Sequence, residues 1–399
     1  MSHQNQLSRW MQEVSSRMPH LSKPQATVLA LLSFGMVVVQ SSGISRLSLF
    51  LVLLLDEQEN TLRQRLREWY YDAPDKRGQQ RQQVDVTTCF APLLRWVLAN
   101  WSPTDRRLAL ALDASTLRQV FTVLSVSVMY RGCAIPVAWV VLPACEPGAW
   151  QPHWRRLLAA LHGVIPAEWL VIVLTDRGLY APWLYRAIQA NHWHPFMRIN
   201  TQGLVRPHGQ VAFRPLRSLV SVGEAWRGTV ECFKTAASRL SCTLVARWEA
   251  GYTDPWLIVT DLPPETSDAL WYGMRSWIEQ GFKDCKRGGW HWEQTKMTDP
   301  ARANRLWLVM AVATLWVVSV GGAADAHLPA SRWQVLPTRP IARPTAKHRL
   351  SPRRLSCFTR GILTVLARLI RSEPIPMAAF VPEMWSSSPL SMAHRYVPF

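Results

Sequence analysis

The order of strand and helix patterns after residue 107 restricts the fold of this chain more than any other feature of its sequence. Three consecutive segments, at 107–113, 120–130 and 134–142, are apolar or alternate between apolar and polar residues, which is typical of antiparallel strands joined by short turns. Helix, strand, helix and strand patterns then follow at 153–161, 169–174, 180–190 and 195–199. Because the WLVIVL strand at 169–174 is uniformly apolar, we expect it to be buried on both faces of a sheet.

This order resembles the mixed sheet of the ribonuclease H-like fold, so the predicted class is α/β with the order βββ-α-β-α-β-α. Residues 200–264 contain further short strand patterns, which indicate a β-rich insertion before two more helices at 270–287 and 302–320. Its strands are expected at 210–214, 229–234, 240–248 and 256–260.

Five units are predicted from these changes of pattern. They are a helical N-terminal domain at 1–103, the first part of the α/β domain at 104–199, the β-rich insertion at 200–264, the remainder of the α/β domain at 265–322, and a basic Pro/Arg-rich C-terminal segment at 323–399. The N-terminal domain contains two apolar runs, 26–39 and 47–55, each shorter than the roughly 20 residues that span a bilayer. We therefore predict two buried helices of a bundle and no membrane association, with a membrane segment as the alternative.

The charge of the chain favours a polyanionic partner. It contains 45 Lys and Arg residues against 27 Asp and Glu residues, a formal net charge of +18, which points to nucleic acid before a membrane surface. In the N-terminal domain, Arg63, Arg65 and Arg67 alternate with apolar positions of a helix that begins near Thr61. We predict that this basic helix binds a DNA groove, and a solvated Arg-rich face is the alternative.

The C-terminal segment is the most basic part of the chain. Residues 332–371 contain ten Lys or Arg and no Asp or Glu, and their Pro-rich first half predicts an extended basic arm. A helix is expected at 358–370, followed by a poorly ordered tail from Pro374 onward. The seven Cys residues contain no C-x-x-C pair, which favours reduced thiols in a cytoplasmic protein.

Two aspartates follow apolar strand patterns. Asp113 ends the first strand of the predicted sheet, and Asp176 comes directly after the WLVIVL strand. Because these two strands are neighbours in a ribonuclease H-like sheet, both carboxylates are expected in the crevice at the end of the strands. A single aspartate in such a position is usually a helix cap, so the pair carries the argument.

Residues 270–287 add a third carboxylate. If this segment is an α-helix that advances by about 100° per residue, four functional residues fall on one face. They are Tyr272, Arg275, Glu279 and Lys286. An amphipathic helix with an incidental Arg/Glu pair is the alternative. Three converging carboxylates repel one another, and two Mg²⁺ or Mn²⁺ ions would relieve that repulsion and suit a two-metal phosphoryl transfer.

Three motifs carry a family resemblance. ALALDASTL around Asp113, VIVLTDRGL around Asp176 and the spacing Y-x2-R-x3-E-x6-K resemble the DDE transposases of bacterial insertion sequences. The last spacing is similar to the signature of insertion-sequence family four, whose members have a β-rich insertion before the glutamate. The resemblance covers residues 107–320, and 103 positions from Asp176 to Glu279 leave room for such an insertion.

The resemblance implies a role for each matching position. Asp113, Asp176 and Glu279 would be the catalytic residues that bind two Mg²⁺ or Mn²⁺ ions. Phosphates of the element's ends would be contacted by Tyr272, Arg275 and Lys286. The family also implies a Trp of the insertion that stacks on a flipped base, for which Trp226 and Trp248 are candidates, with core packing as the alternative.

The same resemblance implies cut-and-paste transposition of an insertion sequence. The enzyme would hydrolyse the phosphodiester at each terminal inverted repeat and transfer the 3′-hydroxyl into target DNA. Its partners would be double-stranded DNA and a second copy in a synaptic complex, in the nucleoid of a bacterial cytoplasm. Two alternatives stay open: a catalytically inactive DNA-binding relative, and a ribonuclease H-like nuclease or resolvase.

Overall fold

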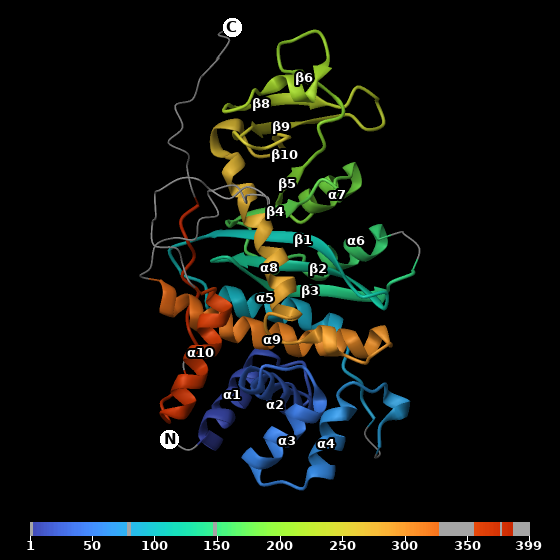
Figure 1. Ribbon diagram of the computed structural model, residues 1–399. Helices are drawn as coiled ribbons and strands as arrows, with labels where there is room; N and C mark the ends of the chain where they lie inside the picture. The colour runs from blue at the N-terminus through green and yellow to red at the C-terminus, as the bar shows by residue number, and fades with distance from the viewer. Residues whose placement is uncertain (1–2, 78–80, 147–149, 327–354, 376, 386–399) are drawn as a thin grey trace.

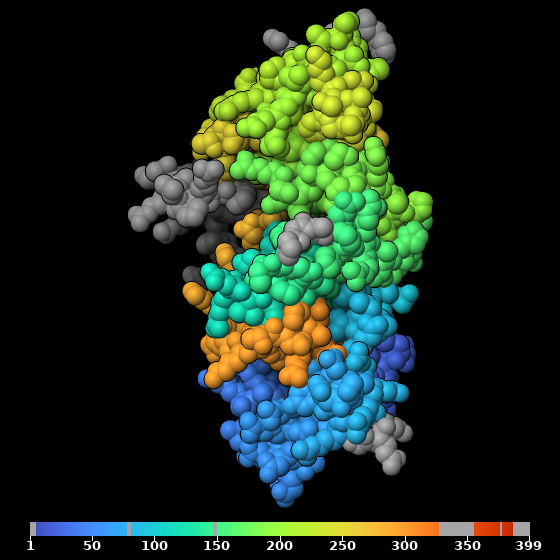
Figure 2. All heavy atoms as spheres, turned by 90° about the vertical axis from the view of Figure 1, so that its right-hand side faces the viewer, coloured from blue at the N-terminus to red at the C-terminus, as the bar shows by residue number. Residues whose placement is uncertain are grey.

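A long apolar helix, α9 (Pro300–Asp325), separates the first four helices of the chain, in residues 3–68, from a central sheet in the computed structural model (Figure 1). The structure describes residues 3–77, 81–146, 150–326, 355–375 and 377–385. Helix α9 packs against the N-terminal helix α2 (Lys23–Val39) on one side and against strand β3 (Cys133–Pro143) on the other. The space-filling view shows the N-terminal unit at one end of the molecule and the insertion at the opposite end (Figure 2).

Five strands form the core of the sheet. They and their two connecting helices are β1 (Arg107–Leu117), β2 (Phe121–Tyr130), β3 (Cys133–Pro143), α6 (Gln151–Ala160), β4 (Leu170–Thr175), α7 (Pro182–Gln189) and β5 (His194–Arg198). Their order is β3-β2-β1-β4-β5, with β4 parallel to both β1 and β5 and the other pairs antiparallel. The predicted ribonuclease H-like class is thereby confirmed.

The β-rich insertion extends this same sheet. Its elements are β6 (Leu204–Pro207), β7 (Arg214–Pro215), the 3-10 helix η3 (Leu216–Leu219), β8 (Ala225–Cys232), β9 (Leu240–Arg247), β10 (Trp256–Thr260) and the 3-10 helix η4 (Pro264–Thr266). Because β10 pairs antiparallel with β5, the sheet has ten strands in the residues that the structure describes. The strand predicted at 210–214 is wrong: Gly209 adopts a left-handed turn conformation and Val211 is 92% exposed, so only residues 214–215 pair.

The N-terminal unit is helical as predicted. Its helices are α1 (His3–Arg17), α2 (Lys23–Val39), α3 (Ile44–Leu55), α4 (Glu59–Glu68) and α5 (Phe90–Ala99), with 3-10 helices η1 (Ala73–Asp75) and η2 (Val86–Cys89). Ser22 begins α2 with a capping box, since its hydroxyl accepts from the Gln25 N–H and the Gln25 side chain accepts from the Ser22 N–H. In α4, Leu62 and Leu66 are buried on one side of the helix.

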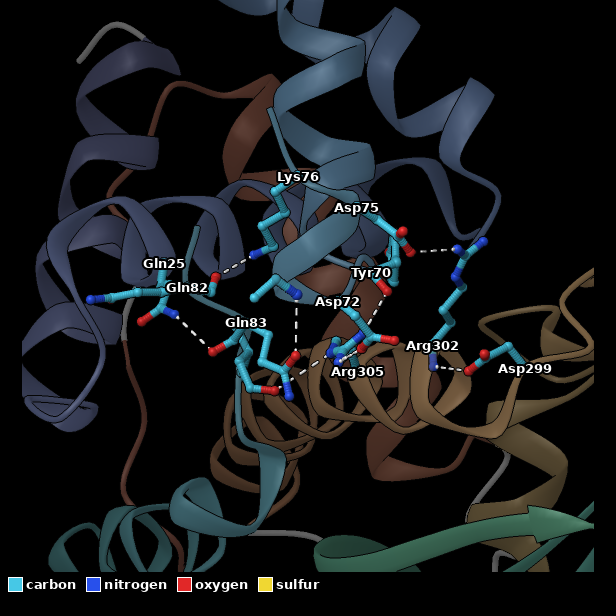
Figure 3. Close-up of polar contacts among 12 residues, drawn as sticks. Gln25, Tyr70, Asp72, Asp75, Lys76, Gln82, Gln83, Asp299, Arg302 and Arg305 are labelled. Atoms are coloured by element: carbon cyan, nitrogen blue, oxygen red, sulfur yellow. Dashed lines mark hydrogen bonds and ion pairs between the residues drawn. The ribbon is translucent and has the colours of Figure 1, made fainter. Parts of the chain in front are cut away.

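Arg305 of α9 fixes the N-terminal unit to the rest of the molecule (Figure 3). Its buried guanidinium donates to the backbone carbonyls of Tyr70 and Val84 and to the carboxylate of Asp72. One helical turn away, Arg302 forms an ion pair of 3.5 Å with Asp75. Removing these acceptors would leave the buried Arg305 guanidinium uncompensated, so this cluster holds the two parts together.

The apolar helices α2 and α9 are packed inside the protein, whereas the apolar helix α3 is only partly buried. Helix α9 is long and apolar enough to span a membrane, but 94% of its most apolar 18-residue window is buried within the protein. Helices α2 and α3 meet at a bend of 99°, with a short polar break between them. The prediction of a buried helix is confirmed for residues 26–39. It is wrong in part for residues 47–55, because only one side of α3 is buried and its Leu49 and Leu53 are 54% and 77% exposed.

Two helical segments follow the insertion, and a third lies near the C-terminus. They are η5 (Ala269–Ser276) with α8 (Trp277–Cys285), η6 (Trp292–Gln294) with α9, and α10 (Cys357–Ile370). Helix α8 crosses β1, β2 and β3 on one face of the sheet (Figure 1).

The predicted disorder of the C-terminal tail is wrong for residues 377–385. The Phe380 ring is fully buried, its carbonyl accepts from the Ser102 N–H, and its own N–H donates to the Asn100 carbonyl. The Arg131 guanidinium donates to the Val381 carbonyl. An aromatic anchor with backbone pairing therefore outweighs the local Pro content. Most of the predicted basic arm, and residues 386–399, lie outside the described residues.

Candidate active site

Asp113 and Asp176 lie at the same level of adjacent strands of the sheet. The prediction that Asp113 ends the first strand is wrong, because β1 continues to Leu117 and Asp113 pairs with Ser125 of β2. Leu112 and Thr175 are the last paired residues of the parallel strands β1 and β4, and each aspartate is the next residue. Neighbouring strands are about 4.8 Å apart, so the two carboxylates begin from neighbouring backbone positions. Parallel pairing alone thus brings together two residues that are far apart in the sequence.

Backbone N–H groups fix one oxygen of each aspartate. Asp113 Oδ1 accepts from the Ala114 N–H at 2.9 Å. Asp176 Oδ1 accepts from the N–H groups of Gly178 and Leu179, both at 3.0 Å. These bonds orient the other oxygen, Oδ2, of each carboxylate toward the guanidinium of Arg275.

The segment that carries Glu279 differs from the predicted continuous helix. Residues 269–276 form the 3-10 helix η5, and the α-helix α8 begins only at Trp277. The Asp268 carboxylate accepts from the Leu270 N–H and so caps the start of η5. Residues three apart eclipse one another in a 3-10 helix, so Tyr272 and Arg275 share a face more closely than an α-helix would allow.

Arg275 joins the three carboxylates. Its Nη2 lies 2.8 Å from Asp113 Oδ2 and 3.7 Å from Asp176 Oδ2, and its Nη1 lies 2.7 Å from Glu279 Oε1. The Arg275 side chain is 8% exposed, whereas Glu279 is 61% exposed and stands at the mouth of the site. The three carboxylates therefore surround one buried cation.

Burial dominates the titration of Asp113. It raises the pKa of this carboxyl to about 6, against the opposing effect of Arg275 and the Ala114 N–H; the carboxylates of Asp176 and Glu279 raise it further. Burial lowers the pKa of Arg275, but the neighbouring carboxylates outweigh it and the net shift is upward. The guanidinium is thus charged throughout the physiological range.

Lys286 reaches strand β1 beside Asp113. Its ammonium donates to Ser115 Oγ and to the Thr116 carbonyl, both at 2.8 Å. Burial lowers the pKa of this ammonium. Ser115 is two residues after Asp113 and so shares its face of the strand. Ser115 is a site residue that was not predicted, although the Asp-Ala-Ser triplet and the two-residue period of the strand were the available signal.

Tyr272 lies deeper than the other residues of the motif. Its ring is 5% exposed and packs edge-on against Trp256 at 5.1 Å, and Arg198 is near enough to oppose the rise in its pKa. Burial raises the pKa of Tyr272 to about 12. Its predicted contact with phosphate stays a prediction, and Arg198 is a second residue that sequence analysis did not select.

The remaining predicted residues lie away from the three carboxylates. Helix α4, with Arg63, Arg65 and Arg67, is on the opposite side of α9 from the sheet (Figure 1). Both carboxylate oxygens of Glu57 accept from Arg65 at 3.0 Å. In the insertion, Trp226 and Trp248 are half-buried, and the Trp248 ring lies under the Arg217 guanidinium at 4.9 Å.

Residues 149–316 match the family model of the transposase DDE domain. This similarity supports a DDE transposase. It implies a DNA substrate, and domains of this family generally use divalent metal ions. The matched range includes Asp176 and Glu279 and begins after Asp113. No curated protein matches the chain.

The donor chemistry of the site fits the ions that DDE domains use. Two Asp and one Glu supply only hard carboxylate oxygens, which Mg²⁺ and Mn²⁺ prefer. Yet among the described residues no three His, Cys, Asp or Glu side chains are grouped closely enough to hold a metal ion. The Arg275 guanidinium lies among the carboxylates instead. The residue types therefore suit these ions, but the Arg275 guanidinium lies at the centre of the three carboxylates.

Asp284 is a fourth carboxylate on the same helix, with a different role. Its side chain is buried and its Oδ1 accepts from Gln280 Nε2 at 2.8 Å. Burial raises its pKa to about 7, although Gln280 and Lys283 oppose the shift. A buried carboxylate with a raised pKa destabilises the fold once it ionises.

We expect Asp284→Asn to gain stability relative to the wild type as the pH rises. The difference in the free energy of unfolding between variant and wild type should be larger at pH 8 than at pH 5. Between the ordinary pKa of 3.8 and about 7 the folded chain keeps a proton that the unfolded chain loses, so the wild type loses stability as the pH rises through this window. The difference should reach about 2 kcal/mol in the free energy of unfolding. Urea unfolding of both proteins at the two pH values measures it, with the exposed Glu265→Gln as control. Parallel pH profiles for Asp284→Asn and wild type would contradict the prediction.

Proposed function

We propose that this protein is a cut-and-paste DDE transposase of insertion-sequence family four. It would hydrolyse the phosphodiesters at the terminal inverted repeats of its element and join the freed 3′-hydroxyl to target DNA. The observation that carries the proposal is the convergence of Asp113, Asp176 and Glu279 on the guanidinium of Arg275. The match to the transposase DDE domain and the basic charge of the chain support it.

In this proposal the three carboxylates hold two Mg²⁺ or Mn²⁺ ions. When bound, the ions would activate a water or a 3′-hydroxyl and stabilise the leaving oxygen. Backbone N–H groups keep one oxygen of Asp113 and of Asp176 fixed, so the second oxygen of each is presented to the centre of the site. Such pre-orientation reduces the reorganisation needed in the transition state.

Three residues of the signature would position the DNA backbone. Lys286 and Arg275 would donate charge-assisted hydrogen bonds to phosphate oxygens, and Tyr272 would contact phosphate or hold Arg198 in place. The insertion would supply Trp226 or Trp248 for stacking on a flipped base.

The DNA-binding surfaces of the rest of the chain follow from its charge. The 1–103 domain would bind DNA through Arg63, Arg65 and Arg67. The 323–399 segment would add further contacts with DNA phosphates. Two synapsed ends call for a homodimer on DNA, in the nucleoid of a bacterial cytoplasm.

The decisive experiment uses the purified full chain and DNA that carries the inverted repeats bracketing this reading frame in its genome. We expect nicking at the repeat ends in Mg²⁺ or Mn²⁺ and none in EDTA. If the protein binds the repeats but neither cleaves nor joins DNA in Mg²⁺ or in Mn²⁺, it is an inactive DNA-binding relative. Cleavage of four-way junctions or RNA–DNA hybrids without preference for the repeats would favour a resolvase or ribonuclease.

Lys286→Ala should weaken binding of the repeat DNA in a salt-dependent way. Each lost phosphate contact reduces the slope of log K against log salt by about 0.9. The slope is measured by fluorescence anisotropy from low to moderate salt. Lys283→Ala, an exposed lysine on the same helix, is the matched control and should leave the slope unchanged. Identical slopes for Lys286→Ala and wild type would remove Lys286 from the phosphate contacts.

A further inference from the structure

Arg275 occupies the position at which the proposed function requires divalent cations. Its two terminal nitrogens lie within 2.8 Å of Asp113 and Glu279 and 3.7 Å of Asp176. The Asp113 oxygen that it contacts is the one that no backbone N–H holds. The guanidinium therefore uses the carboxylate oxygens that face the centre of the site.

A guanidinium and divalent ions compete for such oxygens. Three carboxylates carry a charge of −3, which one arginine offsets only in part, so the site attracts further cations. Mg²⁺ binds oxygen at about 2.0–2.1 Å and tolerates little distortion, so it cannot share a contact point with an N–H donor. Two divalent ions and a guanidinium at the same point would also repel one another.

The position of Arg275 is incompletely satisfied. Its Nε is buried and finds no hydrogen-bond partner within the described part of the chain, although its side chain is 8% exposed. A buried donor without an acceptor is unfavourable. The residue also belongs to η5, a 3-10 segment that adjoins α8, and such segments often mark hinges because their hydrogen bonds are poorer than those of an α-helix. The unsatisfied Nε therefore favours movement of the Arg275 side chain, and the 3-10 backbone of η5 permits that movement.

We propose that Arg275 is the resident counter-ion of the DNA-free site and that divalent cations bind as its guanidinium withdraws from the three carboxylates. The inference rests on the proposed function, because it assumes that these carboxylates bind metal. Arg275 then acts as a positioning residue that keeps the carboxylates together before metal arrives. Once withdrawn, its guanidinium is free to meet a phosphate of the DNA.

Mn²⁺ binding to the DNA-free full chain tests this directly. Titration followed by electron paramagnetic resonance should show that Arg275→Gln binds Mn²⁺ about ten-fold more tightly than wild type. Arg217→Gln is the matched control, since Arg217 also forms an ion pair with an aspartate, Asp254, but lies in the insertion. It should bind Mn²⁺ as wild type does. Adding Asp113→Asn to Arg275→Gln should abolish the increase in Mn²⁺ affinity. That loss would show that the Mn²⁺ ion binds at this site.

Each outcome separates the counter-ion role from the proposed function. Equal Mn²⁺ affinity for wild type and Arg275→Gln, with binding lost in Asp113→Asn, would overturn the counter-ion role and keep a metal site. No Asp113-dependent Mn²⁺ binding in either protein would overturn the proposed metal chemistry as well. If Arg275→Gln does not fold, Arg275→Lys, which keeps the charge but has fewer donors, should bind Mn²⁺ more tightly than wild type. Unchanged or weaker binding by this variant would equally overturn the proposal.

Discussion

Asp113→Asn, Asp176→Asn and Glu279→Gln should each abolish metal-dependent cleavage of the repeat DNA and leave DNA binding largely intact. Each variant removes one anionic oxygen donor from the shared site, and loss of several kcal/mol of transition-state stabilisation lowers the rate by at least about a thousand-fold. Binding to the repeats depends on phosphate contacts spread over a basic surface and changes little. Cleavage in sequencing gels and binding in mobility-shift gels are measured on the same preparations.

The matched control is Asp261→Asn. Asp261 also follows an apolar strand, β10, but its carboxylate contacts His194 Nδ1 and Gln189 Nε2 away from Arg275. This variant should cleave as wild type does. Retained cleavage in any of the three site variants would exclude that residue from catalysis, and activity lost in the control would point to a general effect of substituting strand-end carboxylates.

The neighbouring positions of Asp113 and Asp176 were predictable because they follow from local patterns and one topological rule. Each aspartate ends an apolar run, and the two runs are parallel neighbours in a ribonuclease H-like sheet. No knowledge of side-chain packing was needed. The contribution of Glu279 was predictable in the same way, as a polar position at the edge of an amphipathic segment.

The central position of Arg275 was not predictable from spacing. A uniform α-helix places Arg275 and Glu279 one turn apart on the surface, which indicates an ordinary i,i+4 pair. The 3-10 geometry of η5 instead lets the guanidinium reach Asp113 and Asp176 on two other elements. Such contacts depend on how the segment packs on the sheet, and the sequence of the segment alone does not determine that packing.

Two larger features were also beyond local patterns. The insertion strands Trp256–Thr260 and Leu240–Arg247 were expected, but the way they extend the sheet was not. Trp256–Thr260 pairs with β5 and Leu240–Arg247 pairs with Trp256–Thr260, and such pairing depends on contacts between distant parts of the chain. The tail from Pro374 onward is predicted to be disordered from its Pro content. The order of residues 377–385 depends instead on distant packing, because the Phe380 ring packs edge-on against Tyr130 at 5.0 Å.

The second large effect concerns the crossing of α9 and α10. The two helices approach so closely that a methyl group at Gly361 would overlap the Val317 carbonyl, and one at Gly321 would overlap the carbonyl of Cys357. Both obstacles are backbone atoms, which cannot rotate away as a flexible side chain can. The helices would have to separate, and α10 would lose its packing against α9.

We therefore expect Gly361→Ala to destabilise the protein by about 3 kcal/mol, because overpacking against backbone exceeds the gain of about 1 kcal/mol in helix propensity. Urea unfolding measures the loss, and limited proteolysis should cut within α10. Leu363→Ala, on the exposed side of α10, is the matched control and should change the stability little. Phe358 of α10 packs on Trp290, just beyond Lys286, so undocking of α10 would also loosen the end of the signature segment. Wild-type stability in Gly361→Ala would mean that the helices separate at little cost, and that α10 contributes little to holding that segment in place.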